Sequence, residues 1–335
     1  MKLKDTVRRF QGLRVAVVGD IMLDKYIFGQ ATRISQEAPV PVVKVTEERS
    51  VPGGAANVAR NIVSLGAKAE LFGALADDYD GGLLLRHLQD AGIVTDGVGR
   101  FDDRHTIVKT RVLAGGQQVV RVDHEITADY SKTLHKQILQ KLEERLAAGT
   151  LDAVILEDYA KGLFTPAFME KVVELTHKYH LISALDPHSD HPFNVKGITI
   201  MTPNRSEAFA LARQKPEMKH QSPEHDAGLL AVGKKLLAQW GLEHLLVTLG
   251  GDGMALFKKG APEDYMVIPT VARQVFDVSG AGDTVMASVV LAMLSGVSTS
   301  DACHISNVAA GVVVGRIGTS AIEAEVLEKE LELFG

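Results

Sequence analysis

Short apolar runs alternate with longer amphipathic segments along almost the whole chain. Several of these runs are continuously apolar and end at Gly or Asp. Continuous apolar strands separated by helices are typical of a parallel sheet covered by helices on both faces. We therefore expect an α/β fold. The expected strands are residues 15–18, 70–75, 153–156, 181–185, 197–201 and 244–249, and the expected helices are residues 55–65, 81–91, 131–148, 167–179, 205–213, 225–240, 281–296 and 301–315.

Two segments interrupt this alternation and predict a smaller β structure. Residues 25–52 include Pro39 and Pro41, which suit an edge strand because proline cannot donate to a central ladder. Residues 104–123 hold two β-rich stretches joined by Gly115-Gly116, a sequence that favours a hairpin turn. We interpret both segments as a lid that closes over a ligand and excludes water. A packed β extension or a dimer surface is the alternative.

Composition excludes several classes of protein. The chain has 335 residues, 46% of them hydrophobic, which is enough for a sizeable core. Its net charge of −6 argues against a nucleic-acid or membrane-surface protein. No apolar stretch follows the start MKLKDTVRRF, which predicts no signal peptide, and no run of about 18 apolar residues occurs. Cys303 is the sole cysteine, which fits a reducing compartment. We expect a cytoplasmic protein without nucleic-acid or membrane partners.

The segment Asp277–Thr284 carries the most specific chemical signal. Gly280, Ala281 and Gly282 are small residues at a predicted helix start, where backbone N–H groups favour an anion. Asp283 follows in the first helical turn, although a carboxylate repels phosphate. Its presence indicates a general base for an attacking hydroxyl, while the N–H groups stabilise the transferring phosphoryl group. Ordinary helix capping is the alternative.

A second signal follows the strand 244–249. Gly250, Gly251 and Gly253 form a glycine-rich turn that admits a nucleotide, and Thr248 can donate to phosphate. A hairpin turn is the alternative interpretation.

A third signal follows the strand 197–201. Asn204 and Glu207 have the spacing of a helix capping box, with Arg205 and Ser206 between them. In the functional interpretation, Glu207 holds hydrated Mg²⁺ on nucleotide phosphates. Capping alone is the alternative.

The remaining clusters are candidates for a sugar site. Ligands of open α/β sheets bind outside the carboxyl ends of the strands, and carboxylates accept hydrogen bonds from sugar hydroxyls. Two carboxylates follow the first strand, and a charged cluster follows the strand 153–156, with a solvated loop as its alternative. The Gly-Gly pair before the helix 55–65 forms either a cradle or a tight turn. The residues concerned are Asp20, Asp24, Gly53, Gly54, Asn57, Asp158 and Lys161.

Together these motifs resemble those of the ribokinase-like sugar kinases of the phosphofructokinase-B type, over essentially the whole chain. The resemblance implies one domain, residues 1–335, with a mostly parallel central sheet, helices on both faces, and lid segments at about 25–52 and 104–123. It implies ATP, Mg²⁺ and phosphorylation of a sugar hydroxyl, and it leaves a monovalent-cation requirement open. Relatives are commonly dimers through the lid, and the β-rich lid here permits a homodimer.

The resemblance also assigns roles to residues. It implies that Asp283 is the catalytic base, that Gly280–Gly282 form the anion hole and that Asp24 binds the sugar. Asn204 and Glu207 would organise Mg²⁺ through water. The implied nucleotide-binding residues are Asn204, Arg205, Ser206, Glu207, Thr248, Gly250, Gly251, Gly253 and Asn307.

Longer stretches resemble the kinase half of the bacterial enzymes of ADP-heptose synthesis. They are GDIMLDKY at 19–26, RISQEAPVPVV at 33–43, TIVKTR at 106–111 and DYAKG at 158–162. This resemblance implies phosphorylation of the anomeric C1 hydroxyl of D-glycero-β-D-manno-heptose 7-phosphate to the 1,7-bisphosphate, a step toward ADP-heptose and the lipopolysaccharide core. Arg33, Lys109, Arg111 and Lys161 then become partners of the distal phosphate, because a dianion needs cations. His188 stands where relatives often have Lys, so no cationic role is carried over to it.

Two other functions remain as alternatives. The first is a kinase for another sugar or sugar phosphate, such as ribose or fructose 1-phosphate. The second is a sugar-phosphate sensor that kept the fold without catalysis. The intact Asp283 and its small-residue loop argue against the sensor.

Overall fold

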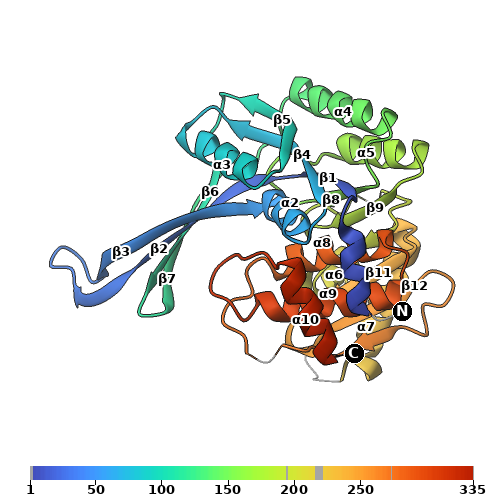
Figure 1. The fold of residues 1–335 in the computed structure, drawn as a ribbon. Helices are drawn as coiled ribbons and strands as arrows, with labels where there is room; N and C mark the ends of the chain where they lie inside the picture. Colours follow the sequence, from blue (N-terminus) through green and yellow to red (C-terminus); the bar gives the residue numbers. More distant parts are fainter. Residues whose placement is uncertain (1–2, 194, 216–221, 273, 335) are drawn as a thin grey trace.

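A computed structural model describes residues 3–193, 195–215, 222–272 and 274–334, and its centre is a nine-stranded sheet (Figure 1). The seven strands from β11 to β5 are parallel to their neighbours, and β12 and β13 add two antiparallel pairs at one edge. In order of adjacency, the strands are β13 (Met266–Ile268), β12 (Met254–Lys258), β11 (His244–Thr248), β10 (Ile200–Met201), β9 (Ile182–Asp186), β8 (Ala153–Glu157), β1 (Arg14–Gly19), β4 (Lys68–Ala76) and β5 (Val94–Phe101).

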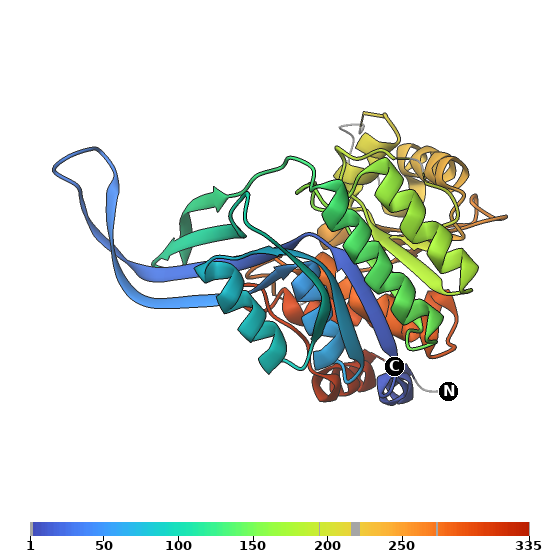
Figure 2. The same ribbon diagram turned by 90° about the horizontal axis from the view of Figure 1, so that it is seen from above.

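Helices cover both faces of this sheet, as the continuous apolar strands predict (Figures 1 and 2). Successive residues of a strand point to opposite faces. Val15 and Val17 of β1 therefore belong to one buried core, and Ala16 and Val18 belong to the other. The first core contains side chains of α1 (Leu3–Val7), α2 (Ala55–Ser64), α3 (Tyr79–Asp90), α8 (Ala281–Leu294), α9 (Thr299–Val313) and α10 (Ala324–Phe334), and the second contains side chains of α4 (Lys132–Ala147), α5 (Pro166–Lys178), α6 (Arg205–Leu211) and α7 (Ala227–Trp240).

A separate four-stranded sheet, the lid, projects from this body (Figures 1 and 2). Pro41 begins an edge strand, and Gly115 and Gly116 turn between two strands with φ of 61° and 83°, values that favour glycine. The lid strands, in order of adjacency, are β3 (Pro41–Gly54), β2 (Ile21–Ile34), β6 (Ile107–Ala114) and β7 (Gln117–His124).

The structure departs from the sequence expectations at two strands. The predicted strand 197–201 is reduced to Ile200–Met201, because Gly197 has a φ of 94° that an extended ladder does not accept. β5 was not predicted, because Asp96, Gly97 and Gly99 are poor strand formers. Packing requires glycine at position 97, since a Cβ on Gly97 would lie 2.3 Å from the Phe72 ring. β13, α1 and α10 were not predicted either, and β12 was predicted only as the second strand of the alternative hairpin after strand 244–249.

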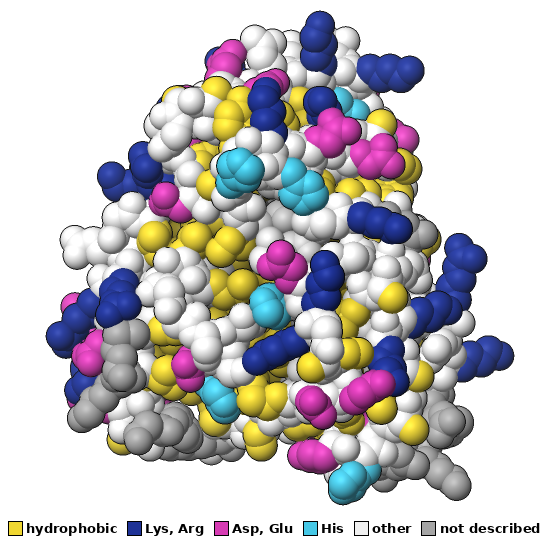
Figure 3. Space-filling view, turned by 90° about the vertical axis from the view of Figure 1, so that its right-hand side faces the viewer, with side chains coloured by type: hydrophobic (Ala, Val, Ile, Leu, Met, Phe, Trp, Pro, Cys, Tyr) yellow, Lys and Arg dark blue, Asp and Glu magenta, His cyan; other side chains and the backbone are white. Residues whose placement is uncertain are grey.

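The surface opposite the lid shows mixed charge. In Figure 3, Lys and Arg side chains are interspersed with Asp and Glu side chains rather than gathered into one basic field. Within the described part of the chain, no helix combines the length and the apolar character needed to span a membrane.

Candidate active site

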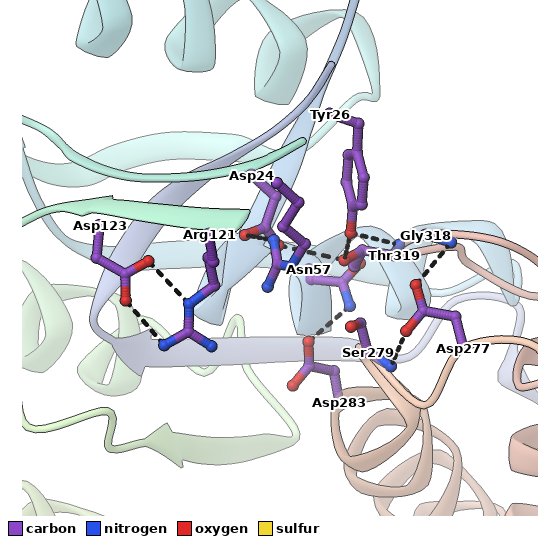
Figure 4. Close-up of polar contacts among 11 residues, drawn as sticks. Asp24, Tyr26, Asn57, Arg121, Asp123, Asp277, Ser279, Asp283, Gly318 and Thr319 are labelled. Atoms are coloured by element: carbon purple, nitrogen blue, oxygen red, sulfur yellow. Dashed lines mark hydrogen bonds and ion pairs between the residues drawn. The ribbon is translucent and has the colours of Figure 1, made fainter. Parts of the chain in front are cut away.

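Asp283 lies in the first turn of α8 and is only 5% exposed. Both of its carboxylate oxygens accept short hydrogen bonds. Tyr159 Oη donates to Oδ1 at 2.6 Å. Asn57 Nδ2 donates to Oδ2 at 2.6 Å (Figure 4). Burial raises the pKa of Asp283, and the bonds from Tyr159 and Asn57 act in the opposite direction. The result is a carboxylate held in one orientation at the edge of the sheet.

The predicted anion site lies at the start of α8. Gly280 is the N-cap with a φ of 79°, and a Cβ there would lie 2.8 Å from Asn57 Nδ2. A larger residue would therefore displace the amide that orients Asp283. The N–H groups of Gly282 and Asp283 belong to the first turn, whose amides have no acceptor within the helix. They are free to face an anion next to the carboxylate.

Two more carboxylates lie beside Asp283. Glu157 ends β8 and Asp186 ends β9, and one oxygen of each lies within 4.8 Å of an oxygen of Asp283. Glu157 has no exposed surface, and neither of its carboxylate oxygens has a hydrogen-bond partner. Burial, and then the neighbouring carboxylates, raise the pKa of Glu157 and of Asp186 well above their ordinary values. Unpaired carboxylate oxygens that repel each other are the chemistry that a hard divalent cation satisfies.

The Asn204–Glu207 segment forms the capping box of α6. Asn204 Oδ1 accepts from the Glu207 N–H at 3.0 Å, and Glu207 Oε2 accepts from the Asn204 N–H at 2.8 Å. Asn204 and Glu207 therefore cap α6. The capping box uses Glu207 Oε2 and leaves Oε1 for another partner. Burial raises the pKa of Glu207. Arg205 forms an ion pair with Asp226, the N-cap of α7, which gives its side chain a structural role. Ser206 is exposed.

Thr248 and the glycines after it lie next to this capping box. Thr248 and Asn204 form a parallel bridge, and β11 and β12 make the hairpin that was the alternative interpretation. A Cβ on Gly250 or Gly251 would meet no atom within 4 Å, so these two glycines border open space. Gly253 differs, because a Cβ there would lie 2.0 Å from the carbonyl oxygen of Ile268. Gly253 therefore serves the turn itself.

Two neighbouring cavities lie between α9 and the segment that follows β13. The larger has a volume of about 470 Å³ and is lined by residues that include Val271, Phe276 and Gly311. The smaller, of about 270 Å³, includes Asn307, whose amide donates to the carbonyl oxygen of Pro269 at 2.7 Å. The structure thus places Asn307 in the wall of the smaller cavity.

The sugar side of the site is formed by the base of the lid. Asp24 lies within β2, not in the loop after β1, and it pairs with Arg111 of β6 at 2.6 Å. Thr319 Oγ1 donates to Asp24 at 3.2 Å, and the Thr319 N–H donates to Tyr26 Oη at 2.9 Å (Figure 4). Asn57 is fully buried, and its Oδ1 has no partner. Asp24 and Asn57 can therefore accept hydrogen bonds from a hydroxyl-rich ligand.

Four of the expected sugar-site residues also have structural roles. Asp20 is 1% exposed and accepts backbone N–H bonds from Tyr159 and Lys161 at 3.0 Å, so it holds the loop after β8 and is closed to a sugar. Burial raises its pKa to about 6. Asp158 accepts from His191 at 2.8 Å. The remaining two are Gly53 and Gly54, where a Cβ would lie 2.6 Å from Asp24 Oδ2 and from the Asp20 carbonyl oxygen, respectively.

The expected cations divide into two groups. Lys109 Nζ lies 5.8 Å from the centre of the Tyr159 ring, and Lys161 pairs with Glu125 at 2.8 Å. Burial and then Lys161 lower the pKa of Lys109. Arg33 lies apart from them in this chain, because it is exposed near the far end of β2, opposite Val42 of the projecting hairpin.

The sequence analysis missed several residues of the site. Glu157 and Asp186 directly follow the predicted strands 153–156 and 181–185, so the rule on strand ends could have found them. Tyr159 lies within the motif at 158–162, yet nothing in the sequence joins it to Asp283. Arg121 was missed as well, although the register of β6 and β7 places it opposite Arg111 on the face of the lid that carries Asp24 (Figure 4).

Comparison with known proteins identifies the family. Residues 13–325 match the model of the pfkB family of carbohydrate kinases. The bifunctional protein HldE of Geobacter sulfurreducens is 38% identical over 316 residues, which cover 94% of this chain and 62% of that protein. The chain therefore spans less than two thirds of the length of this relative.

Solved structures share the fold at lower identity. Arabidopsis thaliana ribokinase complexed with ribose and ATP has a TM-score of 0.70 at 20% identity, covering 96% of this chain and 99% of that one. Phosphofructokinase-2 from Escherichia coli in complex with potassium has a TM-score of 0.73 at 17% identity, with the same coverage. The fold is ribokinase-like, the family implies the use of ATP and Mg²⁺, and the chain belongs to the pfkB family of carbohydrate kinases.

Proposed function

We propose that this kinase phosphorylates the C1 hydroxyl of D-glycero-β-D-manno-heptose 7-phosphate to the 1,7-bisphosphate, with ATP as donor. The observation that carries the proposal is the placement of Asp283 and its N–H groups beneath a lid face that bears Lys109, Arg111 and Arg121. The motifs at 19–26, 33–43, 106–111 and 158–162 and the similarity to HldE support the heptose. Another sugar phosphate is the alternative substrate.

Asp283 acts as the general base in this proposal. The acceptor oxygen bonds to the γ-phosphorus of ATP, the bond from that phosphorus to the bridging oxygen breaks, and ADP leaves. The hydroxyl proton passes to Asp283, while the N–H groups of Gly282 and Asp283 stabilise the phosphoryl oxygens. Asn57 keeps the carboxylate in place through Oδ2. The lid closes over the sugar and excludes water.

The carboxylate cluster fits a magnesium ion. The unpaired oxygens of Glu157 and the carboxylate of Asp186 would hold it, with Glu207 and Asn204 acting through water. When bound, Mg²⁺ supplies positive charge that offsets the charge of the nucleotide phosphates. In this assignment Asp283 stays available as the base.

The distal phosphate has its partners on the lid. Lys109 and Lys161 repel each other, and Arg121 of β7 is 51% exposed and pairs with Asp123. An anion between these cations would relieve their repulsion and accept charge-assisted hydrogen bonds. We propose Lys109, Lys161 and Arg121 as the main phosphate partners, with Arg111 shared with Asp24.

The lid also supports a homodimer. Val120 and Val122 of β7 are 46% and 55% exposed, and they alternate with Arg121 and Asp123, so they lie on the outer face of the lid. A second copy that covers this apolar face would remove it from water.

Replacement of the base is the direct test of the mechanism. Asp283→Asn should lower kcat by about 10²–10⁴-fold, because the acceptor proton loses its base. Nucleotide and sugar binding should survive. The measurement is ATP consumption with ³¹P NMR of the product. The control Asp301→Asn changes an aspartate in the first turn of α9 and should keep activity. Near-normal turnover of Asp283→Asn would contradict the assignment.

The phosphate partners predict a substrate-dependent loss. Arg121→Gln and Lys109→Gln should each raise KM for heptose 7-phosphate by about 10–100-fold, since a hydrogen bond to a charged group is lost. KM for unphosphorylated heptose, already high, should change little. Arg100→Gln, on β5, is the control with a surface ion pair. Equal rises in KM for the two sugars would show that these cations do not bind the phosphate.

Magnesium should change stability through Glu157. A carboxyl whose native pKa is raised binds more protons in the native state than in the unfolded state, so metal-free stability should fall as pH rises above the ordinary carboxyl range. Glu157→Gln should flatten that fall and raise the metal-free Tm by about 2–4 °C at neutral pH. It should also reduce the rise in Tm that Mg²⁺ produces. Thermal scans with chelator or Mg²⁺ test this, with exposed Glu243→Gln as control. An unchanged response to Mg²⁺ would exclude Glu157 as a ligand.

The outer face of the lid predicts the oligomeric state. Two charges introduced by Val120→Lys and Val122→Lys should convert a dimer to a monomer, because they place like charges at the apolar contact. Light scattering after size-exclusion chromatography measures the mass of each form. A wild-type monomer, or a dimer that resists both substitutions, would rule out this interface.

A further inference from the structure

Tyr159 occupies the position on the base that an acceptor needs. Its Oη donates to Asp283 Oδ1 at 2.6 Å, while Asn57 holds Oδ2. A hydroxyl that gives its proton to Asp283 must first form a hydrogen bond of this length to one of these oxygens. The amide of Asn57 carries no transferable proton and supports the carboxylate. The phenol therefore takes the place of the acceptor on Oδ1.

The main chain of Tyr159 is fixed, which leaves its side chain to move. The Tyr159 N–H donates to the buried Asp20 at 3.0 Å, and the next residues are tied to the same carboxylate through the Lys161 and Leu163 N–H groups. Ala160 has a φ of 54°, an uncommon value for a residue with a Cβ. The loop is thus held in a specific conformation that aims the ring of Tyr159 at the base.

The other face of Tyr159 meets a cation of the proposed phosphate site. Lys109 Nζ lies 5.8 Å from the ring centre, a distance within the range of cation–π attraction. A phosphate bound by Lys109 would draw the ammonium away from the ring. The contact that holds the ring in place would then weaken when an anionic sugar binds.

We propose that Tyr159 caps the catalytic base in the sugar-free enzyme and that the acceptor hydroxyl displaces it. The cap prevents Asp283 from activating water beside bound ATP. This inference rests on the proposed function for the identity of the acceptor, but the cap itself requires only that Asp283 is the base.

The reaction that the cap suppresses is ATP hydrolysis. In that reaction a water oxygen bonds to the γ-phosphorus, the bond to the bridging oxygen breaks, and ADP and inorganic phosphate leave. The water proton passes to Asp283, as the sugar proton does in the productive reaction. Both reactions need a free Oδ1, so a phenol on this oxygen blocks water until a better-positioned hydroxyl replaces it.

Tyr159→Phe removes the donor and keeps the ring. ATP hydrolysis without sugar should rise by about 10-fold over the wild type, because the lost bond to a charged group no longer holds the cap. The kcat for sugar phosphorylation should not rise in parallel, since the cap is absent from the productive complex. Tyr265→Phe loses a hydroxyl that donates to Pro223 and should match the wild type in both assays.

A second measurement needs no turnover. Heptose 7-phosphate added without ATP should give a tyrosine difference spectrum in the near ultraviolet, because the phenol leaves a carboxylate. Tyr159→Phe should lose this signal and Tyr265→Phe should keep it. Thermal unfolding shows whether each variant is folded.

The outcomes separate the two proposals. Unchanged or lower sugar-free hydrolysis in folded Tyr159→Phe would overturn the cap, as would a wild-type difference spectrum that Tyr159→Phe retains. If Tyr159→Phe raises hydrolysis while the wild type does not phosphorylate heptose 7-phosphate, the cap is supported and the proposed substrate is wrong.

Discussion

The crowding of three carboxylates at one edge of the sheet is the constraint on which the site depends. Glu157 and Asp186 come from the carboxyl ends of neighbouring parallel strands, and Asp283 comes from the first turn of α8. Strands β8 and β9 pair in register, so Glu157 and Asp186 are directly opposite each other. Their repulsion follows from the sheet and cannot be avoided by a change of rotamer alone. The arrangement is stable only when protons or a cation offset the charge. The fold of the body therefore creates the need for one of these bound ligands.

A single loop connects this charged edge to the lid. The Thr319 backbone carbonyl accepts a hydrogen bond from Arg60 of α2 at 3.0 Å. The Thr319 N–H donates to Tyr26 Oη and the Thr319 hydroxyl donates to Asp24, and both acceptors lie on β2. The preceding Gly318 N–H donates to Asp277, which also receives the Ser279 N–H just before α8 (Figure 4). The base of the lid, α2 and the anion loop are therefore joined by hydrogen bonds through one short segment. A shift of the lid would therefore be transmitted to the loop before α8, which is the proposed anion site.

The sequence predicted what is local and missed what depends on register or on distant contacts. The α/β alternation, the hairpin at Gly115-Gly116 and the turn before Asp283 depend on a few neighbouring residues, and each was found. Arg121 needed the pairing of β6 with β7, and Tyr159 needed the approach of the β8 loop to α8. Asp20 and Asp24 looked equivalent in the sequence. They differ because the chain passes from the body to the lid between β1 and β2. Asp20 lies at this junction and accepts a hydrogen bond from the loop after β8, whereas Asp24 lies within the lid strand β2.

The two parts of the site have separable origins. The groups proposed for the phosphoryl transfer, Glu157, Asp186 and Asp283, all belong to the body, where strand order and helix start fix their positions. The cations proposed to bind the phosphate at the far end of the sugar lie on lid strands or face them. The lid is a separate sheet, so its side chains can change without altering the body. The fold of the body therefore does not by itself set the acceptor. Substrate choice in this chain should then be sought in the face of β6 and β7 rather than in the loop around Asp283.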